Sequence, residues 1–154
     1  MSTISSLYAE SLLFQSPHPS QLPYPVFRSN VHYSLVLFLH SSGDYSIHGL
    51  WPEAVQRVQY CDGIYDESQL ISILDQLQAY WYSFDHNSRD FWKHEYIKHG
   101  TCTNLTELQY FKKVLELFHR AIHKGPTWLQ KWTQKNTVII PVSQDWSFVD
   151  SVTF

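Results

Sequence analysis

The sequence contains little charge, little glycine and no long apolar run, and each shortage excludes a class of protein. Charged residues make up 16% of the 154 positions and hydrophobic residues 44%, a balance that excludes a disordered chain. Five glycines and seven prolines are too few for a collagen-like or linker-like chain. The longest apolar run, at 35–39, is far below the roughly 18 residues of a membrane span. We therefore expect one globular domain and no contact with a membrane.

Net charge is also low. Eleven Lys and Arg against fourteen Asp and Glu give −3 with histidine neutral, whereas a general polyanion binder carries a basic surface. If the protein handles nucleic acid, we expect it to do so at a local site. Nine histidines make this charge depend on pH, and below roughly pH 6.5 the chain can become net positive.

Cysteine is scarce as well. Cys61 and Cys102 are the two cysteines of the chain, and they form neither a CxxC pair nor a zinc-binding set. They are either one disulfide or two buried thiols, and residue counting leaves both alternatives open.

The N-terminus lacks the features of a secretory signal. Its first 25 residues have neither a basic region nor an apolar core of 7–15 residues. A cytosolic protein, a mature chain with a new Met and an incomplete gene model all explain this. Four prolines at 17, 19, 23 and 25 prevent a helix, so residues 1–30 are predicted to be an irregular arm before a single domain at 31–154.

The remaining pattern predicts an α+β domain with a few strands and three helices. Strands are predicted at 31–39 and 45–48, joined by a turn at 41–44, with Gly49 and Pro52 ending the second. Helices are predicted at 66–84, from Asn87 or Ser88 to about His99, and from Thr106 to Gly125. Gln109 completes a capping box with Thr106. The third helix carries an apolar stripe of Leu108, Phe111, Leu115, Phe118 and Ile122. Short strands are predicted at 137–142 and 146–152.

The segment FWKHEYIKHGTC at 91–102 concentrates ionisable side chains, with His94, Glu95, Lys98 and His99 within six residues. Residues four apart share a helix face, so Glu95 lies beside His99 and His94 lies beside Lys98. The two pairs are about 100° apart around the helix axis. One helix end would therefore present a carboxylate, an ammonium and two imidazoles to a common space.

Three interpretations of this segment compete. It is a solvated helix with neighbouring charges, a metal site, or an acid–base catalyst. The metal interpretation is weak because the histidines are five residues apart, and the zinc motif HExxH requires four. An imidazole beside a carboxylate and an ammonium suits proton transfer and stabilisation of an anionic transition state.

A second segment, IHGLWP at 47–52, offers another histidine at a strand end. His48 alone is more often structural than catalytic. Gly49 permits close backbone approach, and Trp51 offers a flat aromatic face. Two histidines from separate elements can supply the acid and the base that phosphodiester transesterification requires.

Together these segments resemble a known family. IHGLWPE at 47–53 and FWKHEYIKHGTC at 91–102 resemble, in the same order, the two active-site motifs of the ribonuclease T2 family. The segment between them, YCDGIYDESQLISILDQLQAYW, resembles the family's cysteine followed by a helix. The clear resemblance covers about residues 45–120. It implies a ribonuclease T2-like α+β fold in shortened form, with a small antiparallel sheet and several helices.

The resemblance also implies an activity and a role for each motif residue. The protein would be an endoribonuclease that cleaves single-stranded RNA through a 2′,3′-cyclic phosphate without metal or cofactor. His99 would be the general base and His48 the general acid. Glu95 and Lys98 would stabilise the phosphorane, and His94 would contact phosphate.

Further residues and properties follow from the same resemblance. Trp51 would stack on a base and Glu53 would bond its edge, while Cys61 and Cys102 would form a disulfide that the family shares. The protein should not cleave DNA, because DNA lacks the 2′-OH nucleophile. A monomer is expected, in an extracellular, endolysosomal or vacuolar location. The alternative is a catalytically silent binding or signalling module with the same fold.

Overall fold

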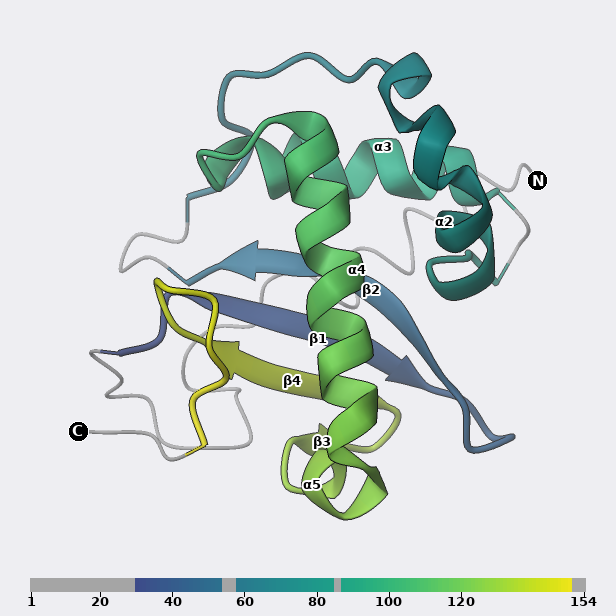
Figure 1. The fold of residues 1–154 in the computed structure, drawn as a ribbon, viewed down its shortest axis with the longest axis vertical. Coiled ribbons are helices and arrows are strands. Elements are labelled where there is room, and N and C mark those ends of the chain that lie inside the picture. Colours follow the sequence, from purple (N-terminus) through teal and green to yellow (C-terminus); the bar gives the residue numbers. More distant parts are fainter. Residues whose placement is uncertain (1–29, 54–57, 85–86, 151–154) are drawn as a thin grey trace.

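The computed structural model describes residues 30–53, 58–84 and 87–150. Its centre is a four-stranded antiparallel sheet in the order β2-β1-β4-β3, crossed on one face by the long helix α4 (Figure 1). The strands are β1 Tyr33–Leu39, β2 Tyr45–Pro52, β3 Thr133–Gln134 and β4 Thr137–Val142. The helices are η2 Glu67–Ile73, α2 Leu74–Tyr80, α3 Ser88–Lys98, η3 Gly100–Cys102, α4 Glu107–Lys124 and α5 Pro126–Gln130. This is the predicted α+β class.

The hairpin of β1 and β2 contains a bulge at the first motif. Val36 pairs with Gly49 and Leu37 pairs with Ile47, so His48 is one extra residue in β2. In a regular strand, residues 47 and 50 would point to opposite faces of the sheet. Here both Ile47 and Leu50 belong to the hydrophobic core because the bulge shifts the alternation by one residue. The strand was predicted to end at His48, and it continues to Pro52 instead.

Helix α4 begins and ends where the sequence predicted. Thr106 is its N-cap and forms a capping box with Gln109, and Gly125 is its C-cap. Its sheet-facing side is wider than the predicted apolar stripe. Phe111, Leu115 and Phe118 are buried as predicted, Leu108 is half-buried, and Ile122 is 37% exposed. The burial extends to Tyr110, Val114, Leu117 and Ala121.

The predicted helix at 66–84 differs from the structure. Asp66 caps its start, but the first part is the 3₁₀ helix η2 and the α-helix stops at Tyr80. The carbonyl of Trp81 accepts a hydrogen bond from the indole N–H of Trp92, so this backbone serves helix α3 and not a further turn of α2. Phe84 consequently lies beyond the helix and is 53% exposed.

The C-terminal segment also differs from its prediction. A single β-bridge joins Val142 to Phe148, and Trp146 has a positive φ of 68°, which no strand residue adopts. The predicted strand at 146–152 is therefore wrong over 146–150, and its last two residues lie outside the described part. Helix α5 and strand β3 were not predicted.

The predicted N-terminal arm at 1–30 lies outside the described residues, apart from Asn30. Among the described helices, none has the length and apolar composition that crossing a membrane requires.

A disulfide joins Cys61, on the segment that follows β2, to Cys102, at the end of η3. Their Cα atoms are 5.2 Å apart. The backbone N–H of Tyr60 donates to the carbonyl of Lys98 at 2.8 Å, so the same segment is also hydrogen-bonded to the end of α3. Of the two alternatives for the cysteines, the structure contains the disulfide.

We expect reduction of this disulfide to lower the free energy of unfolding. The bond spans 41 residues of sequence, and closing a loop of that size contributes up to about 4 kcal/mol in the chain-entropy model. Urea unfolding with and without reductant measures the difference. The variant Cys61→Ser/Cys102→Ser should unfold as the reduced protein does and should show no response to reductant. Equal midpoints for oxidised and reduced protein would contradict the prediction.

Candidate active site

The bulge at His48 places an imidazole on the side of β2 that faces away from the core residues Ile47 and Leu50. The His48 ring stacks on Phe38 of the neighbouring strand, with centroids 4.6 Å apart, and contacts Phe91 of α3 at 5.4 Å. His48 is 1% exposed. Two aromatic rings therefore fix the orientation of this imidazole.

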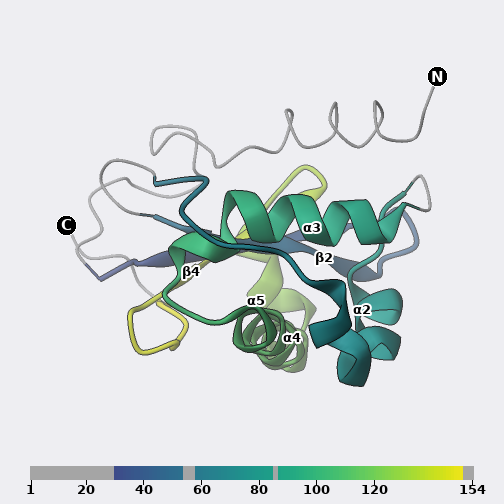
Figure 2. The same cartoon turned by 90° about the horizontal axis from the view of Figure 1, so that it is seen from above.

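Helix α3 supplies the second half of the site. It lies beside the β2 edge of the sheet, and Figure 2 shows it separate from the layer formed by α4, α5 and α2. As predicted, Glu95 and His99 share a face, and both are buried. Lys98 is also buried, and His94 is half-buried. The first of the three interpretations, a solvated helix with neighbouring charges, is therefore not what the structure shows.

The Glu95 carboxylate connects the two halves. One oxygen, Oε1, accepts a hydrogen bond from the Trp51 indole at 2.9 Å. The other, Oε2, lies 3.7 Å from Nε2 of His48. The Trp51 ring in turn stacks on His99 at 4.9 Å and meets His48 edge-on at 5.0 Å. The residues His48, Trp51, Glu95 and His99 thus form one contact cluster, although 51 positions separate the two histidines in the sequence.

Gly49 is required for this contact. A Cβ atom at this position would lie 2.2 Å from Oε1 of Glu95 and 2.9 Å from the Trp51 indole nitrogen. No side-chain carbon can occupy such a space without moving one of these groups. The close backbone approach expected of Gly49 is therefore confirmed, and what approaches it is the Glu95 carboxylate.

Tyr110 of α4 anchors the strand that carries the site. Its hydroxyl donates to the carbonyl of Leu50 at 3.1 Å and accepts from the Leu50 N–H at 3.4 Å. Burial raises the pKa of this hydroxyl well above its usual range, so it stays protonated and able to donate. This bond fixes β2 between the bulge and Trp51.

The electrostatics of the cluster disfavour added positive charge. Burial, together with the neighbouring His94 and Lys98, lowers the pKa of His48 to about 3. Burial and Lys98 also lower the pKa of His94. Burial lowers the pKa of Lys98, and the nearby Glu95 opposes that shift. In this arrangement His48 is neutral over the physiological range of pH.

The two residues predicted to bind a base, Trp51 and Glu53, differ in their burial and in their contacts. Trp51 is 1% exposed and one of its faces is on His99, so its ring is part of the cluster in this structure. Glu53 is half-buried at the end of β2, where Oε2 accepts from the Ser34 hydroxyl at 3.2 Å. Base binding by these two residues stays a prediction.

Two residues of the site had no functional signal in the sequence. Phe38 and Phe91 enclose His48, but a phenylalanine in an apolar strand or a helix is expected to be a core residue. Within the described ranges, no three His, Cys, Asp or Glu side chains lie close enough together to hold a metal ion.

Comparison with known proteins shows what this chain is related to. The model of the ribonuclease T2 family matches residues 29–146, which include both motifs and the whole cluster. The chain belongs to the ribonuclease T2 family. The predicted resemblance is therefore confirmed, and it extends beyond the 45–120 stretch on which it was based.

Relatives of this T2-family chain come from fungi, plants and animals. It is 29% identical over 119 residues to ribonuclease T2 of Aspergillus oryzae, covering 70% of this chain and 41% of that protein. It is 41% identical over 86 residues to ribonuclease T2 protein rnst-2 of Caenorhabditis elegans, covering 48% and 31%. It is 39% identical over 80 residues to intracellular ribonuclease LX of Solanum lycopersicum, covering 47% and 34%. The matched part spans 31–41% of the length of these relatives.

Solved structures show the same fold. A variant of RNase MC1 in complex with 5′-UMP superposes with a TM-score of 0.62 at 19% identity, covering 77% of this chain and 90% of the other. RNase NT in complex with 5′-AMP gives 0.58 at 22% identity, covering 79% and 90%. The predicted T2-like fold is therefore confirmed.

We expect Gly49→Ala to displace Glu95 from the cluster, because the new methyl group would overlap its carboxylate. Overpacking of this kind costs about 1–3 kcal/mol. NMR signals of the His48 and His99 imidazoles should shift in this variant. In the control Gly43→Ala, the φ of 93° strains the new residue, but no atom lies within 4 Å of its Cβ, so the strain has no overlap to transmit and the imidazole signals should stay in place. Unchanged imidazole signals in Gly49→Ala would contradict the close approach.

We expect the protein to lose stability as pH falls from about 6.5 toward 3. The pKa of His48 is about 3 in the folded protein and about 6.5 when unfolded, so between these values the unfolded chain binds more protons. The contribution of one such histidine is up to about 1.4 kcal/mol per pH unit. Denaturant unfolding at pH 7, 5.5 and 4 measures it, and His48→Asn should flatten the dependence. Parallel pH curves for the two proteins would refute the assignment.

Proposed function

We propose that this chain is a metal-independent endoribonuclease acting on single-stranded RNA. The observation that carries the proposal is the convergence of His48 and His99, from different elements, on the Glu95–Trp51 pair. Transesterification of a phosphodiester requires one proton to be removed and another delivered, and two imidazoles are suited to both transfers near neutral pH. Membership of the ribonuclease T2 family supports the same chemistry.

In the proposed first step, His99 takes the proton of the ribose 2′-OH as its oxygen attacks phosphorus. The bond from phosphorus to the 5′-oxygen breaks, and His48 gives its proton to that leaving oxygen. The product is a 2′,3′-cyclic phosphate. In the second step the roles reverse: His48 takes a proton from water, the water oxygen attacks phosphorus, and His99 protonates the departing 2′-oxygen.

Substrate charge has a specific part in this scheme. His48 must carry a proton in the first step, yet burial holds its pKa at about 3 in this structure. A scissile phosphate brings negative charge next to the imidazole, which favours the protonated form and raises the pKa of His48. The acid would therefore be charged chiefly when RNA is bound.

The remaining residues of α3 would act on the developing charge. Lys98 supplies positive charge for the equatorial oxygens of the phosphorane, and His94 would contact the phosphate. Glu95 would help to stabilise the phosphorane by holding His48 and Trp51 in position through the two contacts of its carboxylate. Trp51 and Glu53 would bind a base if RNA separates the Trp51 ring from His99.

The substrate class rests on the 2′-OH, which is the nucleophile of the first step, so we propose that DNA is inert. Two proteins of the same fold have been solved with the nucleotides 5′-UMP and 5′-AMP, which supports a nucleotide substrate. The Cys61–Cys102 disulfide supports an oxidising location, either extracellular or endolysosomal or vacuolar. We further propose that the protein acts as a monomer.

We expect His48→Ala and His99→Ala each to lower the rate of RNA cleavage by about 10²–10⁴-fold, the usual contribution of a general acid or base. Gel analysis of a single-stranded RNA substrate in EDTA measures the rate, and the wild-type protein should remain active there. His123→Ala is the matched control, because His123 is an exposed histidine of α4 outside the cluster.

Three outcomes would contradict the proposal. A variant that keeps the wild-type rate would remove that histidine from the mechanism. Activity restored only by added metal would refute the metal-free chemistry. RNA binding by the wild-type protein without any cleavage would favour the alternative, a silent binding or signalling module.

A further inference from the structure

The positive charge of this acidic chain is concentrated in one stretch. Residues 108–135 contain six Lys and Arg but one acid, Glu116, so this stretch carries +5 and the rest of the chain −8. The six basic residues are Lys112, Lys113, Arg120, Lys124, Lys131 and Lys135. A chain-wide net charge of −3 therefore conceals a strongly basic segment.

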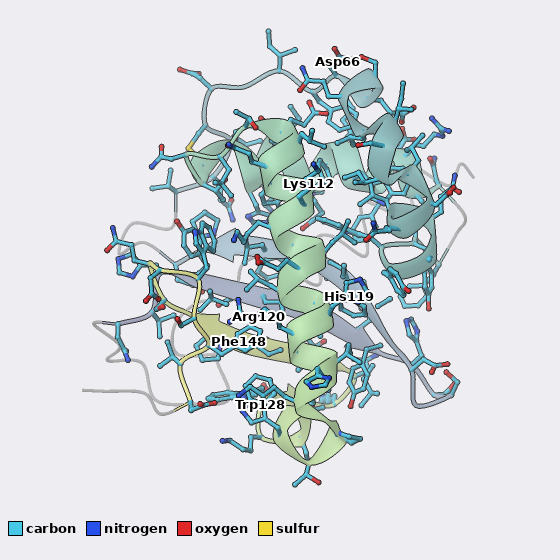
Figure 3. All side chains as sticks on the ribbon, viewed as in Figure 1. Asp66, Lys112, His119, Arg120, Trp128 and Phe148 are labelled. Carbon is cyan, nitrogen blue, oxygen red and sulfur yellow. A yellow bond between two sulfur atoms is a disulfide. The ribbon has the colours of Figure 1, made fainter. Side chains whose placement is uncertain are left out.

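The fold places these charges along α4 and in the two short segments that follow it. Five of the six side chains are exposed, and Lys113 is half-buried. Four of the six lie on α4, Lys131 is the C-cap of α5, and Lys135 lies in the turn before β4. Figure 3 shows Lys112, His119 and Arg120 along α4, with Trp128 and Phe148 beside its C-terminal half. We call the surface formed by Lys112, Lys113, Arg120, Lys124 and Lys131 the α4 basic face. It shares no residue with the active-site cluster.

Aromatic rings hold three cations of α4 in a row, and a fourth cation, Lys131, lies over Trp132 at 5.6 Å. Lys113 lies over Trp146 at 5.5 Å from the ring centroid, and Lys124 lies over Trp128 at 5.6 Å. Arg120 lies over Phe148 at 5.0 Å. At about 100° and 1.5 Å per residue, positions 113, 120 and 124 fall within about 40° of one another and extend over about 16 Å of helix.

These restraints pre-organise positive charge. A lysine or arginine loses rotamer freedom when it binds a phosphate, and a cation already held over a ring has less freedom to lose. Arg120 is held further by a hydrogen bond from Nη1 to the Trp146 carbonyl at 3.0 Å. Three acids lie on or beside this row, and each has a hydrogen-bond or ion-pair partner. Asp145, next to Trp146 in the sequence, accepts from the Ser143 hydroxyl and the Ser147 N–H. Glu116 is paired with Lys113 at 2.8 Å, and Asp150 accepts from the Trp128 indole at 2.9 Å.

We infer that the α4 basic face is a second binding surface for single-stranded RNA, one that contacts the phosphate backbone away from the catalytic cluster. An extended row of fixed cations matches the repeated charges of a nucleic acid backbone. A membrane surface fits less well, because peripheral membrane helices present exposed apolar side chains. On this face the rings are half-buried beneath their cations.

The role of this surface rests on the proposed function, because the RNA that it binds would be the substrate of the active site. A polymer held on the α4 basic face is tethered to the protein, and tethering raises the effective concentration of its other segments at the active site. The surface should therefore favour long RNA over dinucleotide substrates without changing the chemical step.

The decisive measurement is binding of a fluorescent single-stranded oligonucleotide whose 2′-O-methyl groups prevent cleavage. Because it needs no catalysis, its failure is distinct from failure of the proposed activity. In the variant Lys112→Gln/Lys124→Gln/Lys131→Gln, the slope of log K against log salt should fall by about 2, since each contact to a single strand contributes about 0.7. Glutamine and lysine have similar helix propensity, so the variant should fold, which circular dichroism checks.

A matched pair of variants tests position against net charge. Glu116→Gln and Asp75→Asn each remove one negative charge, but Glu116 lies on the α4 basic face and Asp75 lies on α2. Glu116→Gln should tighten oligonucleotide binding several-fold, and Asp75→Asn should leave it almost unchanged. Equal effects would show that general attraction, and not this surface, binds RNA, and would overturn the inference.

Two further outcomes would overturn it. The first is unchanged affinity and salt slope in the triple-glutamine variant. The second is tighter binding of the wild-type protein to phosphatidylserine vesicles than to the oligonucleotide, together with a triple-glutamine variant that loses affinity for the vesicles but not for the oligonucleotide. That result would assign the surface to membranes. A fall in cleavage of long RNA with an unchanged rate on a dinucleotide would support the tether.

Discussion

The burial of the Glu95 carboxylate is the constraint on which the rest of the site depends. An ionised carboxylate loses several kcal/mol of hydration when it leaves water, so it requires polar partners at close range. Trp51 donates to one oxygen, His48 lies beside the other, and Gly49 leaves the space in which the carboxylate fits. Each of these partners comes from β2, so the electrostatic need of one helix residue determines how α3 lies against the sheet.

Helix α4 has an apolar inner face and a basic outer side. Its inner face is built of Tyr110, Phe111, Val114 and Leu117, and Tyr110 also hydrogen-bonds the strand that carries Trp51. Its outer face carries the cations. The inner side of the helix therefore positions strand β2 at the candidate active site, while the cations lie on other sides of the helix. The disulfide closes the arrangement by joining the segment after β2 to the end of α3.

The parts of this structure that the sequence predicted well are those determined locally. The Thr106 capping box and Gly125 predicted both ends of α4, and the two motifs identified His48 and Glu95, which lie in contact in the structure. Other parts depend on partners distant in sequence. Helix α2 stops at Tyr80 because the backbone of Trp81 leaves the helical region, with φ −130° and ψ 61°, and the Trp81 carbonyl accepts from the distant Trp92 indole. The burial of Trp51 likewise depends on His99, and from the motif alone its ring was expected to face a substrate base.

The extra residue in β2 divides the strand into two parts whose side chains alternate between the sheet faces in different registers. Before His48 the side chains alternate in one register with β1, and after it they alternate in the other. Core positions such as Ile47 and Leu50 can therefore change in size without altering which way His48 points, whereas loss or gain of a single residue between them would rotate every later side chain to the wrong face. In this strand, a substitution at a core position should therefore be less damaging than the insertion or deletion of one residue.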